Sequence, residues 1–174
     1  MLLESLLAKT GYKRISNKKA MDIQDISFDS RNIKKDYLFI AIDGTDDDGH
    51  KYINSAIAYG ASAIVITKDY EIYSKQYPNI TVIETDDARI FLAEASAAFF
   101  NYPTHDMNLM GITGTKGKST ISYMIKNIYD KAEIGCAVIG TVGVAYNGKE
   151  ISTSQTTPSS YELNNIFSLI KKEE

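Results

Sequence analysis

A glycine-rich stretch near the middle of the chain carries residue types suited to phosphate. Residues 111–120 read GITGTKGKST, with a glycine at every third position before Lys118 and Ser119. Glycine permits positive φ, so successive N–H groups of such a loop can converge on phosphate oxygens. Lys118 would neutralise β- and γ-phosphate charge, and the hydroxyl of Ser119 would bind Mg²⁺. We therefore expect a nucleotide triphosphate site here.

The surroundings of this stretch favour the same interpretation. The apolar residues 109–113 predict a strand before it, and 119–132 predict an amphipathic helix after it. Four apolar residues of that helix repeat at helical spacing: Ile121, Met124, Ile125 and Ile128. A helix start adds unpaired N–H groups and a positive dipole end. The general pattern G-x-x-x-x-G-K-[ST] would place a glycine where Ile112 stands, so a simple turn before a helix is the alternative.

Two polar segments of the first half could also bind a ligand. Residues 28–31 read FDSR, and residues 45–50 read TDDDGH. The first is alternatively a turn with a local Asp29–Arg31 pair. The second is alternatively a solvated acidic loop, because no further acidic cluster at ligand spacing supports calcium. His50 and His105 stand alone in the sequence, and we assign neither a catalytic role.

Alternating strands and helices predict an α/β fold. Residues 37–42, 61–67 and 79–85 are apolar runs typical of strands buried on both faces. Helices are expected at 2–9, at 51–61 and from Asp86 or Asp87 onward.

The polar residues 101–108, with Pro103, predict a junction between a domain at 1–104 and a second at 105–174. Beyond it we expect a buried strand at 134–141 and a hairpin turn at Asn147–Gly148. Ser159 and Glu162 have capping-box spacing before a final helix. Its apolar stripe consists of Leu163, Ile166, Phe167 and Ile170.

Composition excludes several classes of protein. The 174 residues carry a net charge of −3, so no general basic field would attract nucleic acid or anionic lipid. No apolar run is long enough for a membrane span. The single cysteine, Cys136, precludes an internal disulfide and fits a reducing cytoplasm. We expect a soluble cytoplasmic protein with no nucleic-acid or membrane partner.

The spacing G-x-x-G-T-x-G-K-[ST] over 111–119 resembles the ATP loop of the Mur ligases and of their folylpolyglutamate synthetase relatives. Four further stretches resemble landmarks of one Mur ligase branch, the UDP-N-acetylmuramyl-tripeptide synthetases, in the same order. They are FDSR at 28–31, the segment 37–65, GTVG at 140–143 and TTP at 156–158. The resemblance runs along essentially the whole chain, but covers only a small N-terminal UDP-sugar-binding α/β domain and the incomplete start of a P-loop ATPase-type central domain.

This resemblance implies an ATP-dependent ligase of peptidoglycan precursor synthesis. Such an enzyme adds the third amino acid, meso-diaminopimelate or L-lysine, to UDP-N-acetylmuramoyl-L-alanyl-D-glutamate through an acyl phosphate, with Mg²⁺. For this chain it implies substrate binding without complete catalytic machinery.

The resemblance also implies roles for particular residues. Lys118 would be catalytic and Ser119 would bind the metal. The ATP contacts would be Gly114, Thr115, Lys116, Gly117, Lys118, Ser119 and Thr120. The UDP-sugar-peptide contacts would be Phe28, Ser30, Thr45, Asp46, Asp47, Gln155, Thr156 and Thr157. The TTP segment is alternatively only a helix lead-in. A stand-alone binding module without ligase activity and a folylpolyglutamate synthetase-like enzyme remain the other hypotheses.

Overall fold

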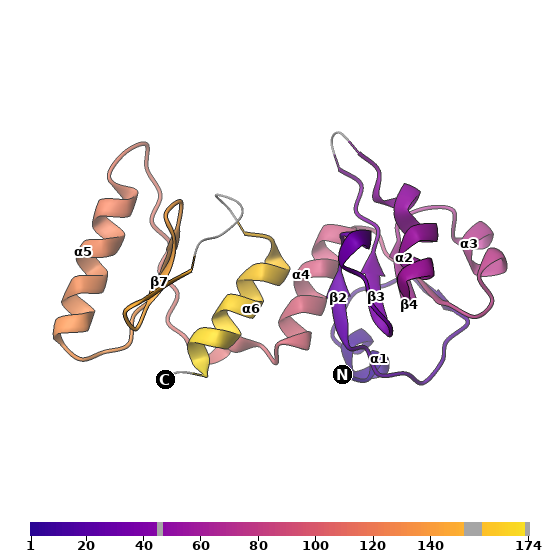
Figure 1. Ribbon diagram of the computed structural model, residues 1–174, viewed down its shortest axis with the longest axis horizontal. Helices are drawn as coiled ribbons and strands as arrows, with labels where there is room; N and C mark the ends of the chain where they lie inside the picture. The colour runs from indigo at the N-terminus through magenta and orange to yellow at the C-terminus, as the bar shows by residue number, and fades with distance from the viewer. Residues whose placement is uncertain (45–46, 152–157, 173–174) are drawn as a thin grey trace. The chain divides into compact units, whose positions relative to one another are not determined.

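The computed structural model describes residues 1–44, 47–151 and 158–172. The chain divides into two compact units, Met1–Asn101 and Tyr102–Glu174, whose elements are labelled in Figure 1. Of the site residues predicted from the sequence, Thr45, Asp46 and 155–157 lie outside the described part.

The first unit is built on a five-stranded sheet. Its strands are β1 (Arg14–Ser16), β2 (Asp25–Ser27), β3 (Tyr37–Ile40), β4 (Ala61–Ile66) and β5 (Thr81–Glu84). Their spatial order is β1-β5-β4-β3-β2. Strands β2 to β5 run parallel, and β1 pairs antiparallel with β5. The carboxyl ends of four strands therefore meet along one edge, which is where open α/β sheets bind ligands.

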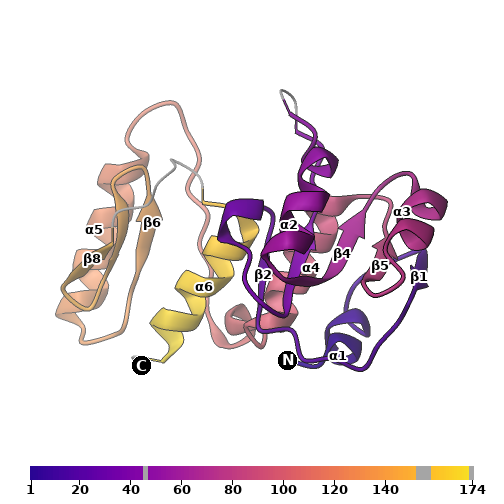
Figure 2. The ribbon, with the colours of Figure 1, turned by 45° about the vertical axis from the view of Figure 1, so that its right-hand side comes forward.

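Helices cover both faces of this sheet, as Figure 2 shows with α2 in front and α4 behind. The helices are α1 (Leu3–Leu7), α2 (Ile53–Tyr59), α3 (Tyr70–Gln76) and α4 (Ala88–Phe99), with short 3₁₀ turns η1 (Ser30–Asn32) and η2 (Gly49–Tyr52). Phe39, Ile64 and Ile66 pack with Ile53 and Ala56 of α2 in one core cluster. Burial on both faces explains why β3 and β4 read as continuous apolar runs.

The sequence correctly predicted strands within 37–42, 61–67 and 79–85. The predicted start of α4 is also confirmed, with Asp87 as its N-cap. The Asp87 carboxylate accepts hydrogen bonds from the backbone N–H groups of Arg89 and Ile90. Such a cap satisfies N–H groups that have no partner within the helix. The α/β fold class predicted from the sequence is confirmed.

The second unit holds η3 (Pro103–Asp106), α5 (Lys118–Lys131), β6 (Val138–Gly140), β7 (Gly143–Tyr146), β8 (Lys149–Ile151) and α6 (Ser160–Lys171). The three strands form an antiparallel sheet in the order β6-β7-β8. Asn147 and Gly148 both have positive φ, 45° and 71°, which confirms the predicted hairpin turn. The predicted capping box is present too: Ser159 and Glu162 exchange hydrogen bonds at the start of α6.

Three expectations for this unit were wrong or incomplete. Residues 109–113 form no strand, because an extended segment needs a neighbouring strand for its hydrogen bonds and none pairs with it among the described residues. The strand expected at 134–141 is confined to β6. The helix α5 forms, but Ile121, Met124 and Ile128 are 48%, 60% and 66% exposed. Helical spacing predicts a common face, and tertiary packing decides whether that face is buried.

Among the described residues, no helix is both long and apolar enough to cross a membrane.

Candidate functional site

The glycine-rich loop leads directly into α5. Gly114 has φ +152° and Gly117, the N-cap residue, has φ +81°. A Cβ at Gly117 would meet no other atom within 4 Å, so its backbone conformation, and not the surrounding space, favours glycine. Glycine offers no capping side chain, and within the described part of the chain no side chain caps the first-turn N–H groups of α5, which suits them to an anionic ligand.

Lys118 is the first residue of α5, and its side chain folds back across the loop. Its Nζ donates a hydrogen bond to the carbonyl oxygen of Gly114 at 2.6 Å. All residues of the loop from Gly114 to Thr120 are exposed, so a ligand can reach them. The ammonium, the first-turn N–H groups and the hydroxyls of Ser119 and Thr120 are thus brought together at one helix end.

This set of donors fits a nucleotide phosphate with its metal ion. Lysine and clustered N–H groups bind phosphate oxygens, and a serine hydroxyl next to phosphate suits Mg²⁺. A simple turn would also allow the Lys118–Gly114 hydrogen bond, because a carbonyl oxygen is an ordinary acceptor for an ammonium group. The metal-binding role of Ser119 stays a prediction, as do the ATP contacts.

The turn after β2 holds Phe28 and Ser30. Asp29 caps η1, because its carboxylate accepts a hydrogen bond from the Arg31 backbone N–H at 3.0 Å. The same carboxylate accepts two hydrogen bonds from the Arg31 guanidinium, from Nε at 2.9 Å and from Nη2 at 2.6 Å. These bonds lower the pKa of the Asp29 carboxyl. The local Asp29–Arg31 pair considered from the sequence therefore exists. It shapes a turn that leaves Phe28 42% exposed and buries Ser30.

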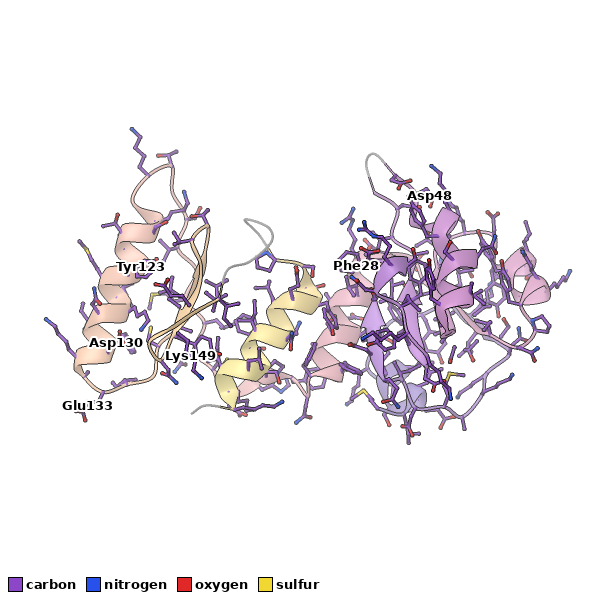
Figure 3. All side chains as sticks on the ribbon, in the orientation of Figure 1. Phe28, Asp48, Tyr123, Asp130, Glu133 and Lys149 are labelled. Atoms are coloured by element: carbon purple, nitrogen blue, oxygen red, sulfur yellow. The ribbon has the colours of Figure 1, made fainter. Side chains whose placement is uncertain are left out.

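The loop after β3 lies at the same edge of the sheet, and Figure 3 labels Phe28 and Asp48, one from each loop. Asp47 accepts hydrogen bonds from the Tyr52 hydroxyl at 2.6 Å and from Lys51 Nζ at 3.3 Å. Both bonds, the tyrosine's foremost, lower the pKa of Asp47. The acidic character of this loop is thus partly compensated within the loop itself.

The expectation that His50 stands alone was wrong. Its ring is buried, with Nδ1 at 2.8 Å from an Asp48 carboxylate oxygen and 3.2 Å from one of Asp43. Lys68 Nζ lies 2.7 Å from the other carboxylate oxygen of Asp48. This hydrogen bond is the largest of the causes that lower the pKa of the Asp48 carboxyl. Sequence reasoning missed this cluster because Lys68 follows β4 and is distant in the chain. Its other members are close in the chain, with Asp43 and the D-G-H triplet at 48–50 on one loop.

Both halves of the chain match families of known proteins. Residues 22–100 match the family described as "Mur ligase family, catalytic domain", and residues 112–174 match "Mur ligase middle domain". The chain belongs to the Mur ligase family. The family resemblance inferred from the sequence is thereby confirmed, and the two matched ranges lie on either side of the segment where the two units join.

Similar Mur ligases carry a consistent name. The "UDP-N-acetylmuramoyl-L-alanyl-D-glutamate--2,6-diaminopimelate ligase" of Clostridium tetani is 38% identical over 167 residues, covering 96% of this chain and 34% of the relative. A protein of the same name from Caldanaerobacter subterraneus is 39% identical over 153 residues, covering 88% of this chain and 31% of the relative. The chain therefore spans about a third of the length of these relatives.

Solved Mur ligase structures share the fold. A structure named "UDP-N-acetylmuramoyl-L-alanyl-D-glutamate--2, 6-diaminopimelate ligase" has a TM-score of 0.65 at 24% identity, covering 88% of this chain and 30% of that one. The MurF ligase from Thermotoga maritima, in complex with ADP, has a TM-score of 0.51 at 19% identity, covering 84% of this chain and 29% of that one.

Proposed function

We propose that this chain is the UDP-sugar-binding and ATP-loop portion of a ligase that adds the third amino acid to UDP-N-acetylmuramoyl-L-alanyl-D-glutamate. The observation that carries the proposal is the Lys118 ammonium held over the loop at the open start of α5. The names of the relatives support UDP-N-acetylmuramoyl-L-alanyl-D-glutamate as the proposed substrate. The same names favour 2,6-diaminopimelate over L-lysine as the incoming amino acid. We assign the reaction to the cytoplasm.

The chemistry explains why a phosphate site is needed. A carboxylate is a poor electrophile because its negative charge repels a nucleophile and it offers no good leaving group. Transfer of the γ-phosphoryl group of ATP to the D-glutamate carboxylate gives an acyl phosphate and releases ADP. The amine of the incoming amino acid then attacks the carbonyl carbon, and phosphate departs as the amide bond forms.

Lys118 serves this transfer by stabilising negative charge on the moving phosphoryl group. The N–H groups of Gly114 to Thr120 hold the remaining phosphate oxygens. Bound Mg²⁺ would supply further charge neutralisation, held in part by the hydroxyl of Ser119.

The first unit is proposed to hold the UDP-sugar at the carboxyl edge of its sheet. Phe28 offers an exposed ring for the uracil, and Ser30 lies in the turn beside it. Asp47 contributes from the loop after β3, together with Thr45 and Asp46. Gln155, Thr156 and Thr157 would contact the muramoyl-peptide.

Calorimetric titration tests the proposal. The 174-residue protein should bind UDP-N-acetylmuramoyl-L-alanyl-D-glutamate and, separately, ATP with Mg²⁺, whereas a GDP-linked sugar serves as the control ligand. Failure to bind either proposed ligand, or equal affinity for the GDP-linked sugar, would refute the assignment.

A further inference from the structure

The His50 ring joins two neighbouring connections of the first unit. Its Nε2 accepts a hydrogen bond from the backbone N–H of Thr67, which directly follows β4, at 3.2 Å. Its Nδ1 faces the carboxylates of Asp48 and Asp43, which lie on the loop after β3. The residue is only 5% exposed, whereas the side chains of Asp43 and Asp48 are 50% and 32% exposed.

These partners determine where the ring carries its proton. A backbone N–H can only donate, so Nε2 must present its lone pair to Thr67. The proton then resides on Nδ1, where it is donated to Asp48 at 2.8 Å. Both ring nitrogens are therefore engaged, one on each connection.

The same cluster has the composition of a metal site, because single ligand atoms of Asp43, Asp48 and His50 lie within 4.8 Å of one another. Its hydrogen bonds oppose that role. A metal ion would need the Nδ1 lone pair, which the proton occupies. Lys68 already supplies the positive charge, since its Nζ lies 2.7 Å from Asp48 and 3.5 Å from Asp43.

The two aspartates are the two ends of one loop. Asp43 and Asp48 form an isolated antiparallel bridge, and the Gly44 N–H donates to the Asp47 carbonyl at 2.8 Å. Gly49 follows at the base of the loop, and a Cβ there would lie 2.7 Å from the backbone of Ile42. The base of the loop is thus tightly packed, and His50 ties it to the adjacent strand.

We propose that His50 is a positioning residue for the UDP-sugar. It fastens the loop after β3 to the end of β4 and so holds Asp47 at the carboxyl edge of the sheet. It touches no substrate in this role. The inference rests on the proposed function, because it takes the loop after β3 to be part of the UDP-sugar site.

The first test is the tautomer of His50 in the unmodified chain, read from imidazole ¹⁵N chemical shifts. We expect Nδ1 to be protonated and Nε2 to be an unprotonated acceptor, with both unchanged by added Mg²⁺ or Zn²⁺. The exposed His105 provides an internal reference in the same spectrum. A proton on Nε2, or a saturable shift of the His50 resonances with either metal, would overturn the proposal.

The second test compares His50→Asn, His50→Gln and His50→Leu with the control His105→Gln. Asparagine can keep a donor near Asp48, glutamine can keep an acceptor near Thr67, and leucine keeps neither. We expect affinity for UDP-N-acetylmuramoyl-L-alanyl-D-glutamate to fall roughly tenfold or more with leucine, and less with the two amides. Affinity for ATP should stay unchanged, as should both affinities in the His105 variant.

The outcomes separate the two proposals. If the unmodified chain does not bind the UDP-sugar, the proposed function fails. If it binds and folded His50→Leu binds equally well, or loses ATP affinity to the same extent, the positioning role is wrong. If the leucine variant fails to fold, the positioning role is tested by the UDP-sugar affinities of the two amide variants and by the tautomer of His50 in the unmodified chain.

Discussion

Lys118 donates a hydrogen bond from its Nζ to the carbonyl oxygen of Gly114, four residues earlier, across the glycine-rich loop. The charge of the side chain is thereby held at the open start of α5 before any ligand arrives. A triphosphate would replace the carbonyl as the acceptor, and a charged acceptor forms the stronger bond.

Lys118→Ala should therefore weaken ATP binding while the protein stays folded. A hydrogen bond to a charged group contributes about 1.5–3 kcal/mol, so we expect affinity to fall at least roughly tenfold. Isothermal titration calorimetry with Mg²⁺ and ATP measures the effect. Lys131→Ala, in the last turn of the same helix, is the matched control. Unchanged ATP affinity in Lys118→Ala would reject the phosphate role of the loop.

Ser30→Ala should weaken binding of UDP-N-acetylmuramoyl-L-alanyl-D-glutamate and leave ATP binding unchanged. Ser30 lies in the turn after β2, whereas the ATP loop belongs to the second unit. We expect a loss of about threefold to tenfold, the scale of one hydrogen bond. Ser55→Ala, at an exposed position of α2, controls for loss of a hydroxyl. The two-site interpretation is untenable if Ser30→Ala lowers both affinities equally.

The paired carboxylates should make the first unit less stable in acid. A carboxyl with a lowered pKa stabilises the fold above its unfolded pKa, and this contribution is lost as the pH falls toward the folded pKa. The pKa values of Asp48 and Asp29 are lowered by Lys68 and Arg31 respectively. The free energy of unfolding should therefore decline between roughly pH 5 and pH 2.

Lys68→Met isolates one of these pairs. Without the ammonium, the pKa of Asp48 should return toward its ordinary value, so the variant should be less stable at pH 7 and show a shallower decline in acid. Urea unfolding measured from pH 7 to pH 3 provides the comparison, with Lys75→Met on α3 as control. Identical pH profiles for Lys68→Met and the unmodified chain would contradict the assignment.

Gly60→Ala should destabilise the first unit. Gly60 ends α2 with φ +116°, and a Cβ there would lie 2.9 Å from the backbone of Lys35. Strained backbone of this kind costs on the order of 1–3 kcal/mol, which a shift in the urea midpoint would reveal. Gly111→Ala is the control, since its Cβ would meet nothing within 4 Å. Equal midpoints in the two variants would show that the close approach to Lys35 carries no strain.

Features encoded within a few residues were predictable from the sequence. The Asn147–Gly148 turn and the Ser159–Glu162 capping box each depend on one short segment. The Asp87 cap is of the same kind. Such motifs satisfy backbone groups locally, so their residue types identify them.

Features that depend on distant partners were not predictable. Residues 109–113 have the composition of a strand, but pairing is decided by what lies alongside. His50 was assigned no partner, and its interaction with Thr67 depends on β3 and β4 being neighbours in the sheet. The apolar pattern predicted where the strands lie in the chain. Which loops lie next to one another depends on the order of the strands in the folded sheet.

The exposed apolar stripe on α5 affects how the purified chain will behave in solution. The helix exposes three large apolar side chains to water, those of Ile121, Met124 and Ile128. The net charge of the protein is only −3. Contiguous apolar surface favours contact between molecules, and so small a charge gives little repulsion against it. This helix therefore contributes apolar surface that favours self-association at high concentration and the binding of hydrophobic dyes.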